Sequence, residues 1–558
     1  MFSFTVRRAC KGGWALVLGL ALTLLTAWPG SAAAQDSGQL AQALPSFAEL
    51  EAAGAVIGAV RIFNRDIFDT DDPKEDYRIF RWVNTLHIQT REGVIERALL
   101  FKSGEPLVAR LVEESERVLR STRYLFDVNL RVAAWHDGVV DIDVETRDTW
   151  TLDPGISAGR SGGANSSGIN LREYNLLGTG IALSLAHSSN VDRSGNEFQI
   201  SNDRAFGTWT ALRYSHASNS DGQRQAASVA RPFYALDTPW AAGVSASNDD
   251  RIESVYNAGN VVSQYRHLQR LAEVYGGLSQ GRVDGWVQRW SLGVSRQDNA
   301  YAIEPGLAAP ALLPPDDRLV APFLRYELIE ERFEKLQNRN QIGRSEIFAL
   351  GLSSTAQLGR AFTGLGSSRD AWLYSGTVSK GFEPLPEHTL LAAATLAGQY
   401  SGGQVRRQRF GGQVQYYLPQ NPHWLFYAAA SGDTLTNPDP TDSLLLGGDN
   451  GLRGYPLRYQ SGTRRMLFTL EERAYTDVYA WRLFRVGGAA FLDTGRAWGG
   501  DNINTVQPGW LANAGVGLRI FSVRAAFSNV LHLDLAFPLD PATNVKKMQF
   551  LVKTKASF

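Results

Sequence analysis

From Trp150 to the end of the chain, short segments alternate between apolar and polar side chains and are separated by Gly, Asn, Asp, Ser and Pro. In Leu531–Phe537, leucine, alanine and phenylalanine surround the polar His532 and Asp534, which share one face. Successive side chains of a strand point to opposite faces, so a period of two predicts strands with one apolar and one polar face. We mark roughly twenty such segments as an upper bound, and segments of about ten residues suit a transmembrane barrel. A long β-sandwich is the alternative.

Residues 55–147 have a different pattern and form a separate predicted domain. The segment begins with an apolar run typical of a strand. Residues 91–101 and 105–119 then have the spacing of amphipathic helices. Two alternating strands follow, joined by Asp137-Gly138, which is a hairpin signal. The predicted order of this domain is β-α-α-β-β.

The N-terminus has the features of a secretory signal peptide, residues 1–34. Basic residues precede an apolar run over 14–28, and small residues lead to a cleavage site after Ala34. The run is shorter than the roughly 18–20 residues of a spanning helix, which favours a signal peptide over a retained anchor. Residues 35–54 are small and polar and are predicted to be a linker. The only cysteine, Cys10, lies in the signal, so we expect no disulfide and no cysteine metal site.

The last segment, Met548–Phe558, also alternates and ends on an aromatic residue. Phe550 and Phe558 share one face, and Lys553 and Lys555 share the other. A membrane strand needs two such faces because lipid lies outside the barrel and water inside, although a soluble edge strand can also have them. The terminal phenylalanine resembles the C-terminal signal of bacterial outer-membrane barrels.

Composition and motifs argue against several classes of function. The 56 basic residues balance the 56 acidic ones, so we expect no nucleic-acid partner. Residues 159–163 match the nucleophile pattern G-x-S-x-G, but a strand follows where a helix is needed, so we interpret them as a hairpin turn. The acidic run Asp69–Asp76 is interpreted as a solvated loop rather than a cation site. We expect no catalytic residues, no cofactor and no metal, and a protein that is not an enzyme.

The glycine loop, residues 447–456, reads Gly-Gly-Asp-Asn-Gly-Leu-Arg-Gly-Tyr-Pro and differs from the strands around it. Its glycines fit a sharply turning backbone, and its only cation, Arg453, suggests a docking partner. Alternation over 467–475 turns Glu471 to the polar face of the next strand, and Asp493 lies near the end of the strand after it. If the loop folds back into a barrel, Arg453 meets Asp493 and Glu471. The alternative is a solvated arginine on an outer hairpin.

The loop and the two strands after it contain a set of motifs in a fixed order. The order runs Leu-Arg-Gly-Tyr, then Glu-x-Arg, then Phe-x-Asp-x-Gly. With a terminal phenylalanine, this order resembles the outer-membrane assembly-factor superfamily, the surface-antigen barrels that include BamA, TamA and the two-partner secretion transporters. The β-α-α-β-β order resembles the POTRA domain of these proteins. The candidate site residues are Leu452, Arg453, Gly454, Tyr455, Glu471, Phe491, Asp493 and Gly495.

The resemblance implies an all-β transmembrane barrel of sixteen antiparallel strands over residues 148–558, preceded by one small α/β POTRA-like domain. Segments beyond sixteen would then be split strands or hairpins in extracellular loops. It also implies that Arg453 pairs with Asp493 inside the barrel, with Glu471 nearby, as a structural latch. The barrel would lie in the outer membrane of a Gram-negative cell, with the POTRA-like domain in the periplasm.

The resemblance further implies a function in assembling or translocating polypeptides. The exposed edge strand of the POTRA-like domain would capture an unfolded polypeptide client by strand addition, and the barrel would insert the client or pass it outward. Accessory periplasmic proteins would be further partners, beside the lipid bilayer. Two alternatives stay open: a passive outer-membrane pore, and a dedicated two-partner secretion transporter of the hemolysin-activator type.

Overall fold

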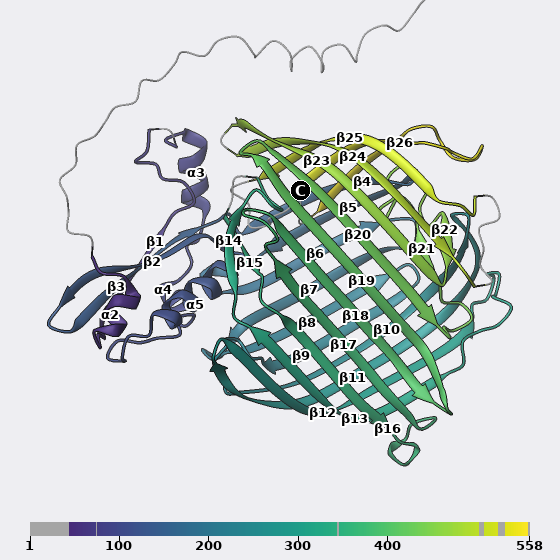
Figure 1. Ribbon diagram of the computed structural model, residues 1–558, viewed down its shortest axis with the longest axis horizontal. Coiled ribbons are helices and arrows are strands. Elements are labelled where there is room, and N and C mark those ends of the chain that lie inside the picture. Colours follow the sequence, from purple (N-terminus) through teal and green to yellow (C-terminus); the bar gives the residue numbers. More distant parts are fainter. Residues whose placement is uncertain are drawn as a thin grey trace, which may run out of the picture. The chain divides into compact units, whose positions relative to one another are not determined.

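The computed structural model describes residues 44–73, 75–342, 345–481, 483–500, 507–522 and 530–555 (Figure 1). The chain divides into two units, Met1–Pro45 and Ser46–Phe558, and every helix and strand described here belongs to the second. The predicted signal peptide and Phe558 lie outside the described residues. No helix in the described ranges has both the length and the apolar character needed to cross a membrane.

As far as the structure describes it, the N-terminal domain is a three-stranded sheet with four helices. The sheet has the order β1-β3-β2, with β1 parallel and β2 antiparallel to the central β3. One apolar core joins the sheet to α2, α4 and α5. The elements in chain order are α2 (Phe47–Ala52), β1 (Val56–Arg65), α3 (Arg78–Leu86), α4 (Glu92–Glu96), α5 (Ala109–Arg120), β2 (Leu125–His136) and β3 (Val139–Asp148).

The domain begins earlier than the sequence pattern indicates. Ser46 caps α2, because its hydroxyl accepts the N–H of Glu49 while the Glu49 carboxylate accepts the N–H of Ser46 at 2.7 Å. Leu50 of this helix is buried in the core of the domain. The last residues of the predicted linker 35–54 are therefore part of the folded domain.

The predicted order β-α-α-β-β also omits α3, which lies between β1 and α4. Phe80 of this helix stacks on Phe68, with ring centroids 3.9 Å apart. On its other side Ile79 and Trp82 are exposed. Two ion pairs hold the acidic run before α3: Arg147 pairs with Glu75 at 2.7 Å, and Arg81 pairs with Asp76.

The two edges of the small sheet differ in how far they are covered. At the start of β1, Ile57 donates its N–H to the carbonyl of Glu105, and Leu107 donates to the carbonyl of Ala55. Residues 104–107 therefore cover part of the β1 edge. The opposite edge is β2, on which Asn129 and Arg131 are exposed and Leu130 points into the core.

Among the described residues, the rest of the chain closes into a barrel of 20 strands, so the predicted count of sixteen is wrong. Every neighbouring pair of strands is antiparallel, and β27 closes the barrel against β4. The strands are β4 (Leu152–Ser161), β5 (Ala164–Glu173), β6 (Ile181–Ser189), β7 (Ser194–Ala205), β8 (Thr210–Asn219), β9 (Gly222–Arg231), β10 (Trp240–Asn257), β11 (Asn260–Val283), β12 (Trp286–Ile303), β13 (Asp317–Glu330), β16 (Ser353–Ala361), β17 (Ala371–Phe382), β18 (Thr389–Ser401), β19 (Gln404–Asn421), β20 (Trp424–Thr436), β23 (Arg464–Ala480), β24 (Phe484–Trp498), β25 (Leu511–Ser522), β26 (Val530–Pro538) and β27 (Gln549–Lys555).

Two further hairpins belong to connections between barrel strands. The inner hairpin, β14 (Phe333–Gln337) with β15 (Ser345–Ala349), connects β13 to β16. A shorter pair, β21 (Leu444–Leu446) with β22 (Gln460–Gly462), lies between β20 and β23 and frames the glycine loop.

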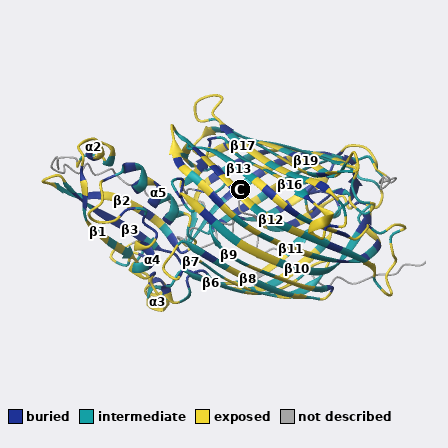
Figure 2. Ribbon diagram, turned by 90° about the horizontal axis from the view of Figure 1, so that it is seen from below, coloured by how far each residue is buried: buried dark blue, intermediate teal, exposed yellow. Residues whose placement is uncertain are grey.

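The predicted alternation appears along the barrel strands as alternating burial (Figure 2). On β26, His532 and Asp534 are buried, whereas Leu535 and Phe537 are exposed. On β27, Phe550 is exposed on the outer face. Since the polar face is the buried one, the barrel is apolar outside and polar inside, which is the arrangement of a membrane barrel.

The N-terminal domain contacts one end of the barrel, which we call the domain-side end. The Asn175 side chain in the β5–β6 turn donates to the hydroxyl of Thr90 at 2.7 Å. In the β9–β10 turn, the Leu236 N–H donates to the Glu114 carboxylate at 2.6 Å. Arg117 pairs with Glu331 at 3.4 Å, just before the inner hairpin. The inner hairpin therefore starts from the domain-side end, and not from an extracellular loop at the opposite end.

Candidate functional site

The glycine loop is buried inside the barrel. Leu452 and Tyr455 are completely buried and pack with Tyr459 in a cluster that includes Leu511 of β25. The loop also bonds to itself, since Leu452 donates its N–H to the carbonyl of Gly447 at 3.0 Å. An outer, solvated hairpin would not bury these side chains, so the alternative reading of the loop does not apply.

Close contact with the barrel wall explains why position 454 of the loop is a glycine. A Cβ on Gly454 would lie 2.7 Å from the Cβ of Asn513 and 3.1 Å from the nitrogen of Pro538. The Gly454 N–H donates to the Asn513 side chain at 3.1 Å. The absence of a side chain at this position lets the backbone lie directly on β25 and brings Arg453 to the wall.

Arg453 forms the centre of a buried ion cluster. Its Nε and Nη2 donate to the two carboxylate oxygens of Asp493 at 2.8 and 2.7 Å. Its Nη1 donates to Glu471 at 2.8 Å. The guanidinium also stacks on the ring of Phe491, 3.4 Å from the centroid. A guanidinium suits this site because its planar fork bonds both oxygens of one carboxylate while its face lies on an aromatic ring.

Strand register places the partners of Arg453 in two rows across β23, β24 and β25. Thr469, Asp493 and Asn513 form one row. The Thr469 hydroxyl and the Asn513 amide each donate to Asp493 at 2.9 Å. Phe491 lies in the row that begins with Glu471, and the third position of that row is a glycine that leaves room for the ring. Asp493 thus accepts hydrogen bonds from Thr469 and Asn513 of the wall as well as from Arg453 of the loop, which fixes the position of its carboxylate.

The cluster extends beyond the residues that the sequence predicts. Arg473 donates to Glu471 at 3.1 Å. Asp534 of β26 lies 3.8 Å from the guanidinium of Arg453 and pairs with Arg519 of β25. Three arginines and three carboxylates are thereby buried together, which balances their charge inside the wall. The polar face of Leu531–Phe537 includes Asp534, but its distance from Arg453 follows only from strand pairing.

The inner hairpin reaches the same cluster from the domain-side end. Arg473 donates to the carbonyl of Arg339 at 3.0 Å, and the Tyr475 hydroxyl donates to the carbonyl of Asn338 at 2.8 Å. The Tyr417 hydroxyl donates to the side chain of Asn340 at 3.0 Å. A chain of buried polar contacts therefore connects the loop between β20 and β23 to the hairpin between β13 and β16.

The glycine loop also bridges the seam, where the first barrel strand meets the last. Among the described residues, β27 and β4 share one register pair, Val552 with Arg160, whereas β26 and β27 share seven. The carbonyl of Gly448 accepts from the hydroxyl of Ser161 on β4 and from the ammonium of Lys553 on β27, the latter at 2.7 Å. The loop thus supplies hydrogen bonds to both strands where their own pairing is shortest.

A second ion pair anchors the residues just after the glycine loop at the barrel end opposite the N-terminal domain. Arg458 pairs with Asp192 in the β6–β7 turn and lies over the ring of Tyr256, 4.3 Å from the centroid. The hydrogen bonds from Arg458 hold the pKa of the Asp192 carboxyl below its usual range. This pair lies outside the strands and is partly exposed.

The remaining predicted residues are placed as follows. Gly495 lies on β24, where a Cβ would come within 2.8 Å of the Met466 carbonyl. Within the described ranges no group of three or more His, Cys, Asp or Glu side chains is arranged to hold a metal ion.

Fold and site together define a closed β-barrel with a loop docked in its lumen and a small α/β domain at one end. No protein-family model matches the chain, and no curated protein matches its sequence. It is similar in structure to BamA from Haemophilus ducreyi lacking POTRA domains 1–3, with 14% identity over 89% of this chain and 85% of that chain and a TM-score of 0.40. It is also similar to CdiB from Escherichia coli, with 12% identity over 89% and 76% and a TM-score of 0.46. BamA is one of the proteins that the sequence motifs resemble, and the likeness is one of fold alone.

Proposed function

We propose that the protein is an outer-membrane barrel that accepts unfolded polypeptides through its N-terminal domain and inserts or translocates them. The observation that carries this proposal is the seam, which is joined by one described register pair and bridged by a buried, ion-paired loop. A barrel that only has to stay closed gains nothing from a short seam. A seam that a docked loop holds closed can instead open when the loop moves.

The outer membrane is the proposed location because the outward face is apolar. Leu292 and Trp290 of β12, and Leu470 and Phe468 of β23, are exposed there. Only closed barrels and helices satisfy their backbone groups in lipid. The N-terminal domain would then lie in the periplasm as the POTRA-like domain of the barrel.

Client capture is proposed at β2, the edge strand of the small sheet. An extended segment can add to such an edge through backbone hydrogen bonds, which give affinity with little dependence on sequence. A photo-crosslinker at the exposed Asn129 would detect a client or an accessory periplasmic protein, and one at the exposed Phe63 of β1 is the matched control. Crosslinks from both positions at equal yield would argue against capture at β2.

The glycine loop and the inner hairpin, which occupy part of the lumen, favour a regulated conduit over a passive pore. The glycine loop occupies the lumen beside β23 to β25, and the inner hairpin packs on Tyr417 and Tyr475. A passive pore needs an open water-filled path. Dedicated export would require the glycine loop or the inner hairpin to leave the lumen, whereas insertion would require the seam to open.

A disulfide across the seam tests the proposal. Arg160→Cys and Val552→Cys are register partners, and the only native cysteine, Cys10, lies in the predicted signal peptide. In liposomes supplied with an unfolded barrel client, we expect folding of the client to stop when the pair is oxidised and to return on reduction. Ser215→Cys with Ala226→Cys, register partners on β8 and β9, is the control pair.

The outcomes separate the candidate functions. Export of a secreted client that continues with the seam locked would favour a dedicated transporter. Client folding that never exceeds that of empty liposomes, together with a large steady conductance, would favour the passive pore.

A further inference from the structure

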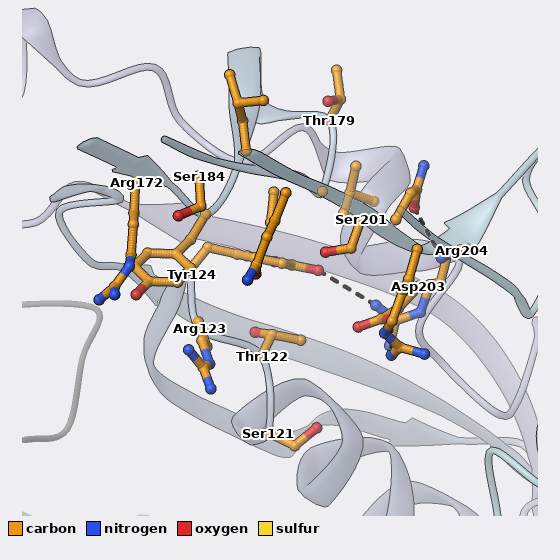
Figure 3. Close-up of a pocket in the computed structure, with 18 of the residues that line it drawn as sticks. Ser121, Thr122, Arg123, Tyr124, Arg172, Thr179, Ser184, Ser201, Asp203 and Arg204 are labelled. Carbon is orange, nitrogen blue, oxygen red and sulfur yellow. Dashed lines mark hydrogen bonds and ion pairs between the residues drawn. The ribbon is translucent and has the colours of Figure 1, made fainter. Parts of the chain in front are cut away.

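A cavity of about 550 Å³ lies between the N-terminal domain and the domain-side end of β5 to β8 (Figure 3). We call it the arginine pocket. From the domain it is lined by Arg97 and by the turn 121–124, and from the barrel by polar side chains that include Arg172 and Ser184. Figure 3 shows the turn 121–124 of the domain beside Arg172 and Ser184 of the barrel.

Register places three barrel side chains of the pocket, Arg172, Ser184 and Arg213, on the lumen face. Leu171 pairs with Leu185 across β5 and β6, and both are exposed on the outer face. Arg172 and Ser184, one position along, form the next register pair and therefore point inward. By the same alternation, Arg213 of β8 faces inward, since the next residue along the strand is exposed outside. A molecule in this pocket would be at the mouth of the lumen rather than in the lipid.

The pocket is strongly cationic. Five arginines line it against one carboxylate, Asp203, which pairs with Arg213 at 2.5 Å. In the described part of the chain, the carboxylate partner of Arg172 is the distant Asp153, at 4.0 Å. Three arginines have no carboxylate within 4.0 Å among the described residues: Arg97, Arg123 and Arg204. The positive charge of the pocket is therefore largely uncompensated by the protein.

Arg204 and Tyr124 provide donors at the wall of the pocket. Arg204 donates to the hydroxyl of Tyr124 at 3.4 Å and lies over the ring of Trp209, 4.9 Å from the centroid. The Nε of Arg204 is buried and has no hydrogen-bond partner in the part of the chain that the structure describes. Burial raises the pKa of Tyr124, so its hydroxyl stays protonated and can donate. The side chain of Arg204 is thus held by packing while its bonding capacity is incompletely used.

We propose that the arginine pocket binds the carboxylates of an acidic polypeptide segment as it enters the barrel. The proposal rests on the proposed function and names the chemistry of the client that the lumen mouth recognises. Arginine forks bond carboxylates with two parallel hydrogen bonds, and the hydroxyls of Ser184 and Ser201 can bond the peptide backbone beside them. A phospholipid is disfavoured because Arg172 and Arg213 of the barrel wall face away from the lipid.

Direct binding tests this proposal without requiring transport. The probe is a fluorescein-labelled peptide of alternating serine and glutamate, with a glutamine counterpart, measured by anisotropy with the full-length protein in detergent. Arg123→Gln with Arg204→Gln should weaken binding of the glutamate peptide about tenfold or more, because two charge-assisted contacts are lost. Asp203→Asn should strengthen binding, since it removes the one competing carboxylate of the pocket. Arg224→Gln changes a lumen-facing arginine at the far end of β9 and should leave binding unchanged.

Each outcome decides the matter. Loss of binding in the double variant, with heat-modifiable gel mobility like wild type and a tighter Asp203→Asn, supports the pocket. Equal binding of the glutamate and glutamine peptides, or binding unchanged in the double variant, overturns it. Displacement of the glutamate peptide by equimolar inorganic phosphate would also overturn it in favour of a phosphate site. If the glutamate peptide binds as expected but client folding never occurs, the proposed function fails and the pocket stands.

Discussion

Arg453 and Asp493, 40 residues apart in sequence, are joined inside the barrel by two hydrogen bonds of 2.8 and 2.7 Å. One belongs to a glycine-rich loop and the other to a strand of the wall. Because both are buried, the pair is not weakened by water as a surface pair is. The same loop bridges the seam through Gly448, and Glu471, the other partner of Arg453, also bonds Arg473, which contacts the inner hairpin.

Charge reversal should show how much the contact between Arg453 and Asp493 itself contributes to the stability of the barrel. Arg453→Asp and Asp493→Arg should each destabilise the barrel by about 3–5 kcal/mol, because each leaves unpaired buried charge. The double reversal should recover part of that loss. Urea unfolding in detergent, followed by tryptophan fluorescence, measures the three variants. A double variant no more stable than either single one would refute the pairing as a stabilising contact.

Gly454→Ala should release the loop without changing any charge. The added methyl would meet the Cβ of Asn513 and the nitrogen of Pro538 in the wall, which can move little. We expect faster trypsin cleavage within residues 447–459. Gly364→Ala is the control, since a Cβ there meets nothing within 4 Å. Equal cleavage of the two variants would show that the loop is not held against β25.

The inner hairpin should restrict ion flow. Tyr475→Phe with Tyr417→Phe removes two hydroxyls that bond Asn338 and Asn340 and leaves the aromatic rings in place. We expect larger or more frequent open events in planar bilayers. Tyr214→Phe, on the outer face of β8, serves for comparison and should behave as wild type. Conductance unchanged in the double variant would mean that these bonds do not hold the hairpin.

The outer contact between Arg458 and Asp192 should depend on pH. Because the pKa of Asp192 is lowered in the folded state, its contribution is complete above the unfolded value of about 3.9 and is lost as pH falls through the folded value. We expect pepsin to cleave the segment 447–459 faster as the pH is lowered through that range. Asp192→Asn should cleave at a rate that no longer changes there, and an unchanged pH profile in this variant would contradict the assignment.

Alternation in the sequence was sufficient to orient single strands but not to assemble them. The alternation over 467–475 predicts that Glu471 faces the lumen, and there it accepts a hydrogen bond from Arg453. The proximity of Asp534 and Arg519 to the same cluster follows from strand register, which no local pattern contains. The resemblance implies sixteen strands, which is wrong, because closure depends on which strands pair and not on their period.

Two other elements were missed for identifiable reasons. The inner hairpin has the same period of two as a barrel strand, so sequence alone does not distinguish the two positions. Helix α3 has apolar residues on both its buried face, at Phe80, and its exposed face, at Ile79 and Trp82. At nine residues, α3 is shorter than the roughly 10–12 residues over which hydrophobic periodicity distinguishes a helix from a strand.

The central claim is that the Arg453 contact secures the loop that bridges the seam. Hydrogen–deuterium exchange of β4 and β27 in wild type and in Arg453→Ala tests it most directly, with the β17–β18 pair as an internal reference. The account predicts that exchange in β4 and β27 accelerates in the variant while β17 and β18 exchange as before. Unchanged protection of β4 and β27, or an equal loss of protection throughout the barrel, would contradict it.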